Sequence, residues 1–174
     1  VDTAPGYEDG YSEEIVGDAI QGRREEVFLV SKVLPSHADF AGTLRACERS
    51  LRRLRTDRLD VYLLHWRAGG APLAETFRAF AALLAAGKIR AFGVSNFDVA
   101  DLEEAWALDR RIACNQVLYH LRDRDIETDV VPSCERERIA VVGYTPLARG
   151  GFMRGSVADV AKRLGKTPRQ VALN

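Results

Sequence analysis

The chain carries its clearest structural signal in the stretch Leu59-Asp-Val-Tyr-Leu-Leu-His65-Trp66. The nearly unbroken apolar run from Leu59 to Leu64 is typical of a strand covered on both faces, as in a parallel sheet. A polar residue, His65, follows directly at its end. The same kind of run returns elsewhere in the chain, at Val27–Val30, Ile89–Val94, Ile112–Val117 and Ile139–Val142.

Amphipathic stretches of helical spacing separate these runs, as where Leu44, Cys47, Leu51 and Leu54 recur on one face. The distance between successive runs is about the length of one βα unit. Such alternation leaves two main folds, an open doubly wound sheet or a closed eight-fold barrel. A doubly wound dinucleotide fold would be favoured by Gly-x-Gly-x-x-Gly after its first strand, and the sequence has no such fingerprint.

Polar residues cluster at or just after the end of each predicted strand. They are Ser31-Lys32, His65-Trp66, Ser95-Asn96, Asn115-Gln116 and Tyr144-Thr145. The active site of a (β/α)8 barrel lies at this end of its strands. The pattern therefore favours the barrel over the open sheet.

Composition excludes several classes of partner. Among 174 residues, 25 Lys and Arg balance 25 Asp and Glu, so we expect neither nucleic acid nor an anionic membrane surface as a partner. The longest apolar run, Ala79–Gly87, is too short to span a bilayer. The three cysteines are far apart and lack Cys-x-x-Cys spacing, which indicates buried, reduced thiols of a cytoplasmic protein and no metal site.

Residues with helix-capping preferences lie between the predicted strands. We expect Ser12 and Asp98 as N-caps, Pro72 as a first helical residue, a helix starting at Thr167-Pro168, and helix ends at Gly87 and Gly165.

Four residues form the candidate catalytic group: Asp2, Tyr7, Lys32 and His65. Each alone has an ordinary structural explanation, such as a turn residue, loop packing, a solvated charge or a core histidine. Three of them nevertheless fall at the ends of different strands, where Lys and Asp are rare unless paired. Together they suit acid and base chemistry on a carbonyl or an alcohol. A free tyrosine has a pKa of about 10, and a neighbouring ammonium favours the phenolate.

Ordered motifs along nearly the whole chain resemble the aldo-keto reductase family, in particular its bacterial members. The motifs are Asp2-Thr-Ala with Tyr7, Ser12-Glu-Glu with Val16-Gly17, Val30-Ser-Lys32, Asp60-Val-Tyr-Leu-Leu-His65-Trp66, Gly87-Lys-Ile-Arg90, Gly93-Val-Ser-Asn96-Phe97, Asn115-Gln-Val117 and Gly143-Tyr-Thr-Pro-Leu147.

The resemblance implies an NADPH-dependent reductase of small aldehydes and ketones on a (β/α)8 barrel. It assigns Tyr7 as the general acid, Lys32 and Asp2 as the residues that tune it, and His65 as the group that orients the substrate. It assigns Trp66 to the substrate pocket. The residues implied to contact the cofactor are Ser95, Asn96, Gln116, Tyr144, Thr145 and Leu147.

Plain structural roles stay open for the cofactor residues. Ser95 and Asn96 could cap the helix that starts near Asp98, Gln116 could be an ordinary polar residue at a strand end, and Tyr144 could belong to a packed turn.

Length is where the sequence departs from the family, since a full barrel takes about 250 residues. Residues 1–174 are therefore expected to form one partial barrel domain, containing about strands 2 to 7 and truncated at both ends. The segment that would choose between NADPH and NADH is missing, so NADH is not excluded, and the oligomeric state is open. Two alternatives remain, a non-catalytic nicotinamide-binding subunit of the channel-auxiliary type and an inactive fragment.

Overall fold

The structure, a computed structural model, describes residues 1–68, 70–151 and 154–174. The chain divides into two compact units, Val1–Asn115 and Gln116–Asn174, called here the first and the second unit. The prediction that the whole chain belongs to one barrel domain stays a prediction.

The strands alternate with helices and follow one another in the sheet in sequence order. They are β1 (Val30–Val33), β2 (Leu59–Leu64), β3 (Ile89–Ser95), β4 (Ile112–Leu118) and β5 (Ala140–Tyr144). β1 pairs with β2 and β2 with β3, both in parallel. These parallel pairs confirm the predicted α/β class.

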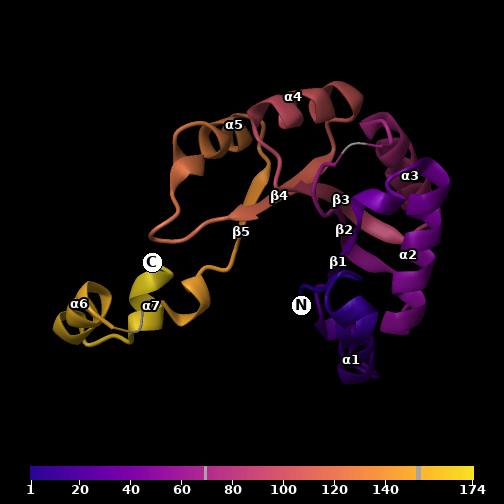
Figure 1. The fold of residues 1–174 in the computed structure, drawn as a ribbon. Helices are drawn as coiled ribbons and strands as arrows, with labels where there is room; N and C mark the ends of the chain where they lie inside the picture. The colour runs from indigo at the N-terminus through magenta and orange to yellow at the C-terminus, as the bar shows by residue number, and fades with distance from the viewer. Residues whose placement is uncertain (69, 152–153) are drawn as a thin grey trace. The chain divides into compact units, whose positions relative to one another are not determined.

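Four α-helices within the described ranges belong to the first unit. They are α1 (Tyr11–Ala19), α2 (Phe40–Leu54), α3 (Leu73–Ala85) and α4 (Val99–Leu108), with short 3₁₀ turns at Glu8–Gly10, Arg24–Glu26 and Pro35–His37. Figure 1 shows α2 and α3 next to each other along β1 to β3. Every residue of β2 is buried, as its apolar run predicts.

An aromatic cluster fills the space between β2, β3 and α3. The rings of Phe80 and Phe92 stack with centroids 5.3 Å apart, and Phe77 meets the edge of Phe92 at 5.5 Å. Tyr62 of β2 closes the cluster against Phe80. Because aromatic side chains bury large areas, this cluster is the main apolar anchor of α3 on the sheet.

The second unit buries less of its sheet. After the end of β4 it contains α5 (Val130–Arg136), β5, α6 (Ser156–Leu164) and α7 (Pro168–Ala172), with 3₁₀ turns at Asp125–Glu127 and Ala148–Gly150. No residue of β5 is buried. The expectation that every apolar run forms a strand covered on both faces is therefore wrong for β5, which is the last strand in the sheet order.

The first strand lies further along the chain than its apolar run indicates. The run was Val27–Val30, but β1 starts at Val30 and contains Ser31 and Lys32. The shift follows from pairing, because β1 matches Val61 to Leu64 of β2 residue by residue. Lys32 thus lies within the strand rather than after it.

Several helix boundaries match their predicted caps. Asp98 accepts a hydrogen bond from the Asp101 amide, Thr167 forms a capping box with Gln170, and Gly165 ends α6 in the left-handed conformation. Pro72 precedes α3 by one residue instead of starting it, and Gly87 follows the C-cap Ala86.

Ser12 as an N-cap is wrong. The N-cap of α1 is Gly10, two residues earlier, and its φ of 93° suits only glycine well. The Ser12 hydroxyl instead hydrogen-bonds the Thr3 hydroxyl at 2.9 Å.

Among the described residues, the structure has no helix long and apolar enough to cross a membrane. The predicted burial of Cys47, Cys114 and Cys134 is confirmed.

Candidate active site

Lys32 is the centre of the candidate site. It pairs with Leu63 in the β1–β2 ladder and is completely buried. Its Nζ atom forms a salt bridge with Asp2, donates to the carbonyl oxygen of Thr3 at 3.0 Å and lies 3.4 Å from the Tyr7 hydroxyl. A buried ammonium needs such partners because burial without them is very costly.

Asp2 reaches Lys32 because residues 1–3 run alongside β1. Asp2 forms a parallel bridge with Val30, and the backbone amide of Thr3 donates to the Val30 carbonyl at 3.0 Å. This pairing fixes Asp2 and the Thr3 carbonyl relative to Lys32.

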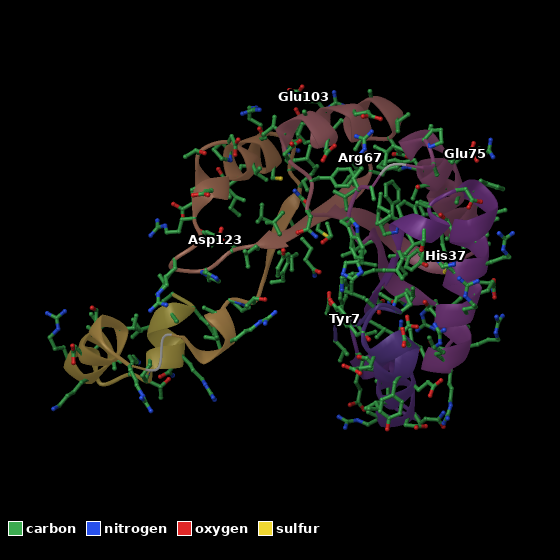
Figure 2. All side chains as sticks on the ribbon, in the orientation of Figure 1. Tyr7, His37, Arg67, Glu75, Glu103 and Asp123 are labelled. Atoms are coloured by element: carbon green, nitrogen blue, oxygen red, sulfur yellow. The ribbon has the colours of Figure 1, made fainter. Side chains whose placement is uncertain are left out.

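Tyr7 lies in the turn between this segment and α1 (Figure 2). Its backbone amide donates to the Ala4 carbonyl, and the next two residues, Glu8 and Asp9, have positive φ angles that reverse the chain into α1. The ring faces the Lys32 ammonium, whose Nζ atom is 5.1 Å from the ring centroid, and the side chain is 41% exposed. Tyr7 therefore contacts a buried cation and is still accessible to a small molecule.

His65 follows β2 and meets Tyr7 edge to face, with ring centroids 5.7 Å apart. Burial and the positive charge of Lys32 lower the pKa of His65 from 6.5 to about 4, while Asp2 opposes the shift. Its Nδ1 atom is buried without a hydrogen-bond partner among the described residues. At neutral pH the ring is therefore uncharged, with one nitrogen as donor and the other as acceptor.

Two further predicted residues of the first unit adjoin His65. Trp66 meets its ring at 4.7 Å and is 41% exposed. Asn96, just after β3, adopts a φ of 60° and donates from its side-chain amide to the His65 carbonyl at 3.0 Å and to the Ser95 hydroxyl at 3.1 Å. The structure thus brings Ser95 and Asn96 to the end of β2 that carries His65. Asp98 caps α4, so the alternative that Ser95 or Asn96 does so is wrong.

The other predicted cofactor residues belong to the second unit. Gln116 lies buried in β4, and Tyr144 is the last residue of β5 and is partly exposed. Thr145 adopts a φ of 54°, and Leu147 precedes the 3₁₀ turn at Ala148–Gly150. Tyr144 therefore belongs to a strand rather than only to a turn.

The group in the first unit suits proton transfer to an oxygen atom. A phenol beside a buried, paired ammonium can release its proton because the positive charge stabilises the phenolate. The neutral His65 can donate a hydrogen bond to the same oxygen without giving up a proton at neutral pH. The arrangement is that of an acid with a separate orienting group.

Sequence reasoning missed three contacts of this site: the Thr3 carbonyl on Lys32, the Glu13 carboxylate on Ser31, and the Asn96 amide on the His65 carbonyl. Backbone acceptors leave no mark in side-chain patterns. For Glu13 a signal existed, since it shares the buried face of α1 with Gly17 and Ile20 at helical spacing.

The comparison with known families agrees with this geometry. The model of the aldo/keto reductase family matches residues 1–173, and the chain belongs to that family. The resemblance drawn from the ordered motifs is confirmed.

Similar proteins include bacterial reductases. The methylglyoxal reductase YeaE of Escherichia coli is 50% identical over 159 residues, which cover 90% of this chain and 56% of that protein. A glyoxal reductase of Bacillus subtilis is 37% identical and is matched over 99% of this chain and 62% of its own length. The chain thus spans little more than half the length of these relatives.

A solved structure supports the predicted fold. An aldo/keto reductase from Klebsiella pneumoniae, crystallised with NADP and acetate, has a TM-score of 0.95 and 48% identity, with 99% of this chain and 63% of that chain covered. This likeness confirms the expectation that the α/β chain is part of a (β/α)8 barrel. The roles of the individual site residues stay predictions.

Proposed function

We propose that the protein reduces small aldehydes and ketones to alcohols, with NADPH as the hydride donor. The observation that carries the proposal is the buried Lys32 ammonium, which joins Asp2, the Thr3 carbonyl and the Tyr7 hydroxyl around one atom. Membership of the aldo/keto reductase family supports it.

Tyr7 gives its phenolic proton to the carbonyl oxygen as that oxygen gains negative charge. Lys32 stabilises the phenolate left behind, and Asp2 keeps the lysine charged and in place. His65 directs its hydrogen bond at the same oxygen, so the carbonyl carbon presents a defined face. When bound, NADPH supplies the hydride that completes the reduction. The products are an alcohol and NADP⁺, and solvent returns the proton to Tyr7.

The chain holds residue types that fit a nicotinamide. Ser95 and Asn96 offer a hydroxyl and an amide at the end of β3, where Asn96 adopts a left-handed backbone that points its amide at His65. Such groups can pair with the carboxamide of a nicotinamide ring. In the second unit we propose Gln116 as a polar contact of the nicotinamide, the exposed ring of Tyr144 for stacking, and Thr145 and Leu147 for the phosphate side. NADH stays an alternative to NADPH.

Small 2-oxoaldehydes are the first substrates to test. Two similar proteins carry the names methylglyoxal reductase and glyoxal reductase. The exposed Trp66 beside His65 offers an apolar wall for a small carbonyl compound. We further propose a cytoplasmic location, which the three buried cysteines, none of them in a disulfide bond, support.

The experiment is a comparison of Tyr7→Phe with the unchanged protein, both expressed from the complete reading frame. Loss of the acid should lower kcat for methylglyoxal by about 10²- to 10⁴-fold. NADPH binding, followed by fluorescence titration, should change little because the ring is kept. A variant that reduces methylglyoxal at the unchanged rate would contradict the assignment of Tyr7 as the acid.

A further inference from the structure

The first two turns of α1 contain a buried carboxylate that the proposed chemistry does not use. Glu13 is completely buried, and both of its oxygen atoms have partners. One accepts from the Ser31 hydroxyl at 2.6 Å, and the other accepts from Arg53 of α2 at 3.0 Å. Ser31 is the residue directly before Lys32 and is itself completely buried.

Ser12, the residue before Glu13, makes a matching contact with Thr3, the residue that follows Asp2. The Ser12 hydroxyl is 2.9 Å from the Thr3 hydroxyl, while the carbonyl of the same Thr3 accepts from Lys32. Two consecutive residues of α1 thus hold the two residues that flank the salt bridge, Thr3 after Asp2 and Ser31 before Lys32.

The contact between Ser12 and Thr3 also closes the loop that carries Tyr7. Residues 4–11 leave Thr3 and return to Ser12, so this hydrogen bond joins the ends of the loop. The separation of 3.4 Å between Lys32 Nζ and the Tyr7 hydroxyl is near the upper limit of a hydrogen bond. A small shift of the loop therefore removes the contact.

Close packing keeps α1 in one place. A Cβ atom on Gly17 would lie 2.4 Å from the Arg53 carbonyl oxygen, and one on Gly10 would lie 2.6 Å from the Arg53 side chain. The Arg53 guanidinium thus packs over Gly10 on its way to Glu13. Because neither glycine can be enlarged without displacing Arg53, α1 has little freedom to slide along α2.

We propose that Ser12 and Glu13, here called the α1 anchor, are positioning residues that set the distance between Lys32 and the Tyr7 hydroxyl. A buried ion pair contributes little net stability compared with apolar residues of the same volume, so stability alone is a weak reason for a charge at this place. The anchor explains it, because the Glu13 carboxylate, held on its other oxygen by Arg53, accepts from Ser31 next to Lys32, and the Ser12 hydroxyl contacts Thr3 next to Asp2. The inference rests on the proposed carbonyl reduction.

The test compares Glu13→Gln and Ser12→Ala with Glu14→Gln in the protein expressed from its complete reading frame. Glu14 is the adjacent, exposed residue, so its change is a matched control. We expect the two anchor variants to lower kcat for methylglyoxal by about tenfold or more, since a displacement of about 1 Å can cost a hundredfold in rate. We expect the KM for NADPH to stay within about twofold in all three, because the anchor touches none of the proposed cofactor residues. Ser12→Thr, which keeps the hydroxyl, should have a kcat close to that of the unchanged protein.

Amide hydrogen exchange of residues 4–10 provides a readout that does not depend on activity. The anchor variants should exchange faster in this segment than Glu14→Gln, while β2 remains protected. If the unchanged protein reduces no carbonyl compound, the proposed function fails, and the exchange result alone decides whether the anchor exists. If the unchanged protein is active and folded anchor variants match Glu14→Gln in kcat, with only a lower melting temperature, the positioning role is wrong.

Discussion

The two units differ in the kind of polar side chain that they bury. In the part of the chain that the structure describes, the buried charged residues Glu13, Lys32 and Asp60 all belong to the first unit, and each has a charged partner. The buried polar residues of the second unit are the neutral Gln116 and Ser133. Since a buried charge must be held by fixed partners, the first unit is built for precise positioning of charge.

The same contrast appears in the sheet. β2 is buried throughout and carries His65 at its end, whereas β5 is largely exposed and ends in Tyr144. The proposed proton-transfer group thus belongs to the first unit, which is well buried. Most of the proposed cofactor contacts belong to the second unit, which is less buried. We expect mutations in the two units to separate chemistry and stability from cofactor affinity.

The largest expected effect is on stability. Phe92→Ala removes a ring that touches two others in the first unit, so the free energy of unfolding should fall by about 3–5 kcal/mol. Val142→Ala in the exposed β5 should cost less than about 1 kcal/mol, because much of its side chain already contacts water. Urea unfolding measures both. Equal losses at the two positions would contradict the contrast in packing.

Activity should separate in the same way. Lys32→Met removes the cation beside Tyr7 and should lower kcat by about a hundredfold, comparable with the loss of one preorganised electrostatic contact. Tyr144→Ala in the second unit should mainly raise the KM for NADPH. Steady-state kinetics with NADPH and methylglyoxal varied in turn distinguishes the two. If Lys32→Met changed only the KM for NADPH, the proposed role of Lys32 in proton transfer by Tyr7 would be wrong.

His65 gives a pH test that is specific to the first unit. Its pKa is about 4 in the folded chain and 6.5 as a free side chain, because burial and Lys32 disfavour the charged ring. Between pH 4 and pH 6.5 the unfolded chain therefore binds more protons at His65 than the folded chain. The contribution of the uncharged His65 to the free energy of unfolding is complete above pH 6.5 and is lost as the pH falls towards 4.

Unfolding titrations between pH 7 and pH 4 should show this loss, and His65→Gln should reduce its slope. His37→Gln, which replaces a histidine outside the candidate site, at the end of the 3₁₀ turn Pro35–His37, is the matched control. Equal slopes in the unchanged protein and His65→Gln would show that His65 does not titrate differently in the folded state.

The smallest effects concern helix caps. Asp98→Ala removes the N-cap bond of α4 and should cost about 1 kcal/mol. Thr167→Ala removes the capping box of α7, a helix of 5 residues with no buried residue, and should cost less. Thermal melts of both variants rank the two caps. A greater loss at Thr167 would indicate that the second unit depends on α7 more than its burial suggests.

Much of the fold followed from the sequence because apolar runs and turn residues act locally. Leu59–Leu64 was predicted to the residue, and Asp98 and Thr167 cap the helices expected of them. The position of β1 was missed because pairing with β2 sets it, and pairing depends on residues far apart in the chain. Ser12 looked like a cap because serine hydroxyls often cap helices, but the Thr3 hydroxyl is its partner.

The candidate site was predictable as a set of residues but not as a geometry. The resemblance identified Asp2, Tyr7, Lys32 and His65, and the structure places them together. The bonds that hold them run through the Thr3 carbonyl and through Glu13, one of two adjacent glutamates that the sequence does not distinguish by type. The helical spacing of Glu13 with Gly17 and Ile20 distinguishes it from Glu14, but its partners Ser31 and Arg53 depend on the tertiary structure.

The most direct test of the proposed chemistry follows the hydride itself. The protein, expressed from its complete reading frame, is mixed with methylglyoxal and NADPH that carries deuterium at the transferable position. We predict an alcohol with deuterium on the former carbonyl carbon, formed at a rate that Tyr7→Phe lowers by about a hundredfold or more. An alcohol without deuterium, or no alcohol from a folded protein that binds NADPH, would contradict carbonyl reduction by hydride transfer.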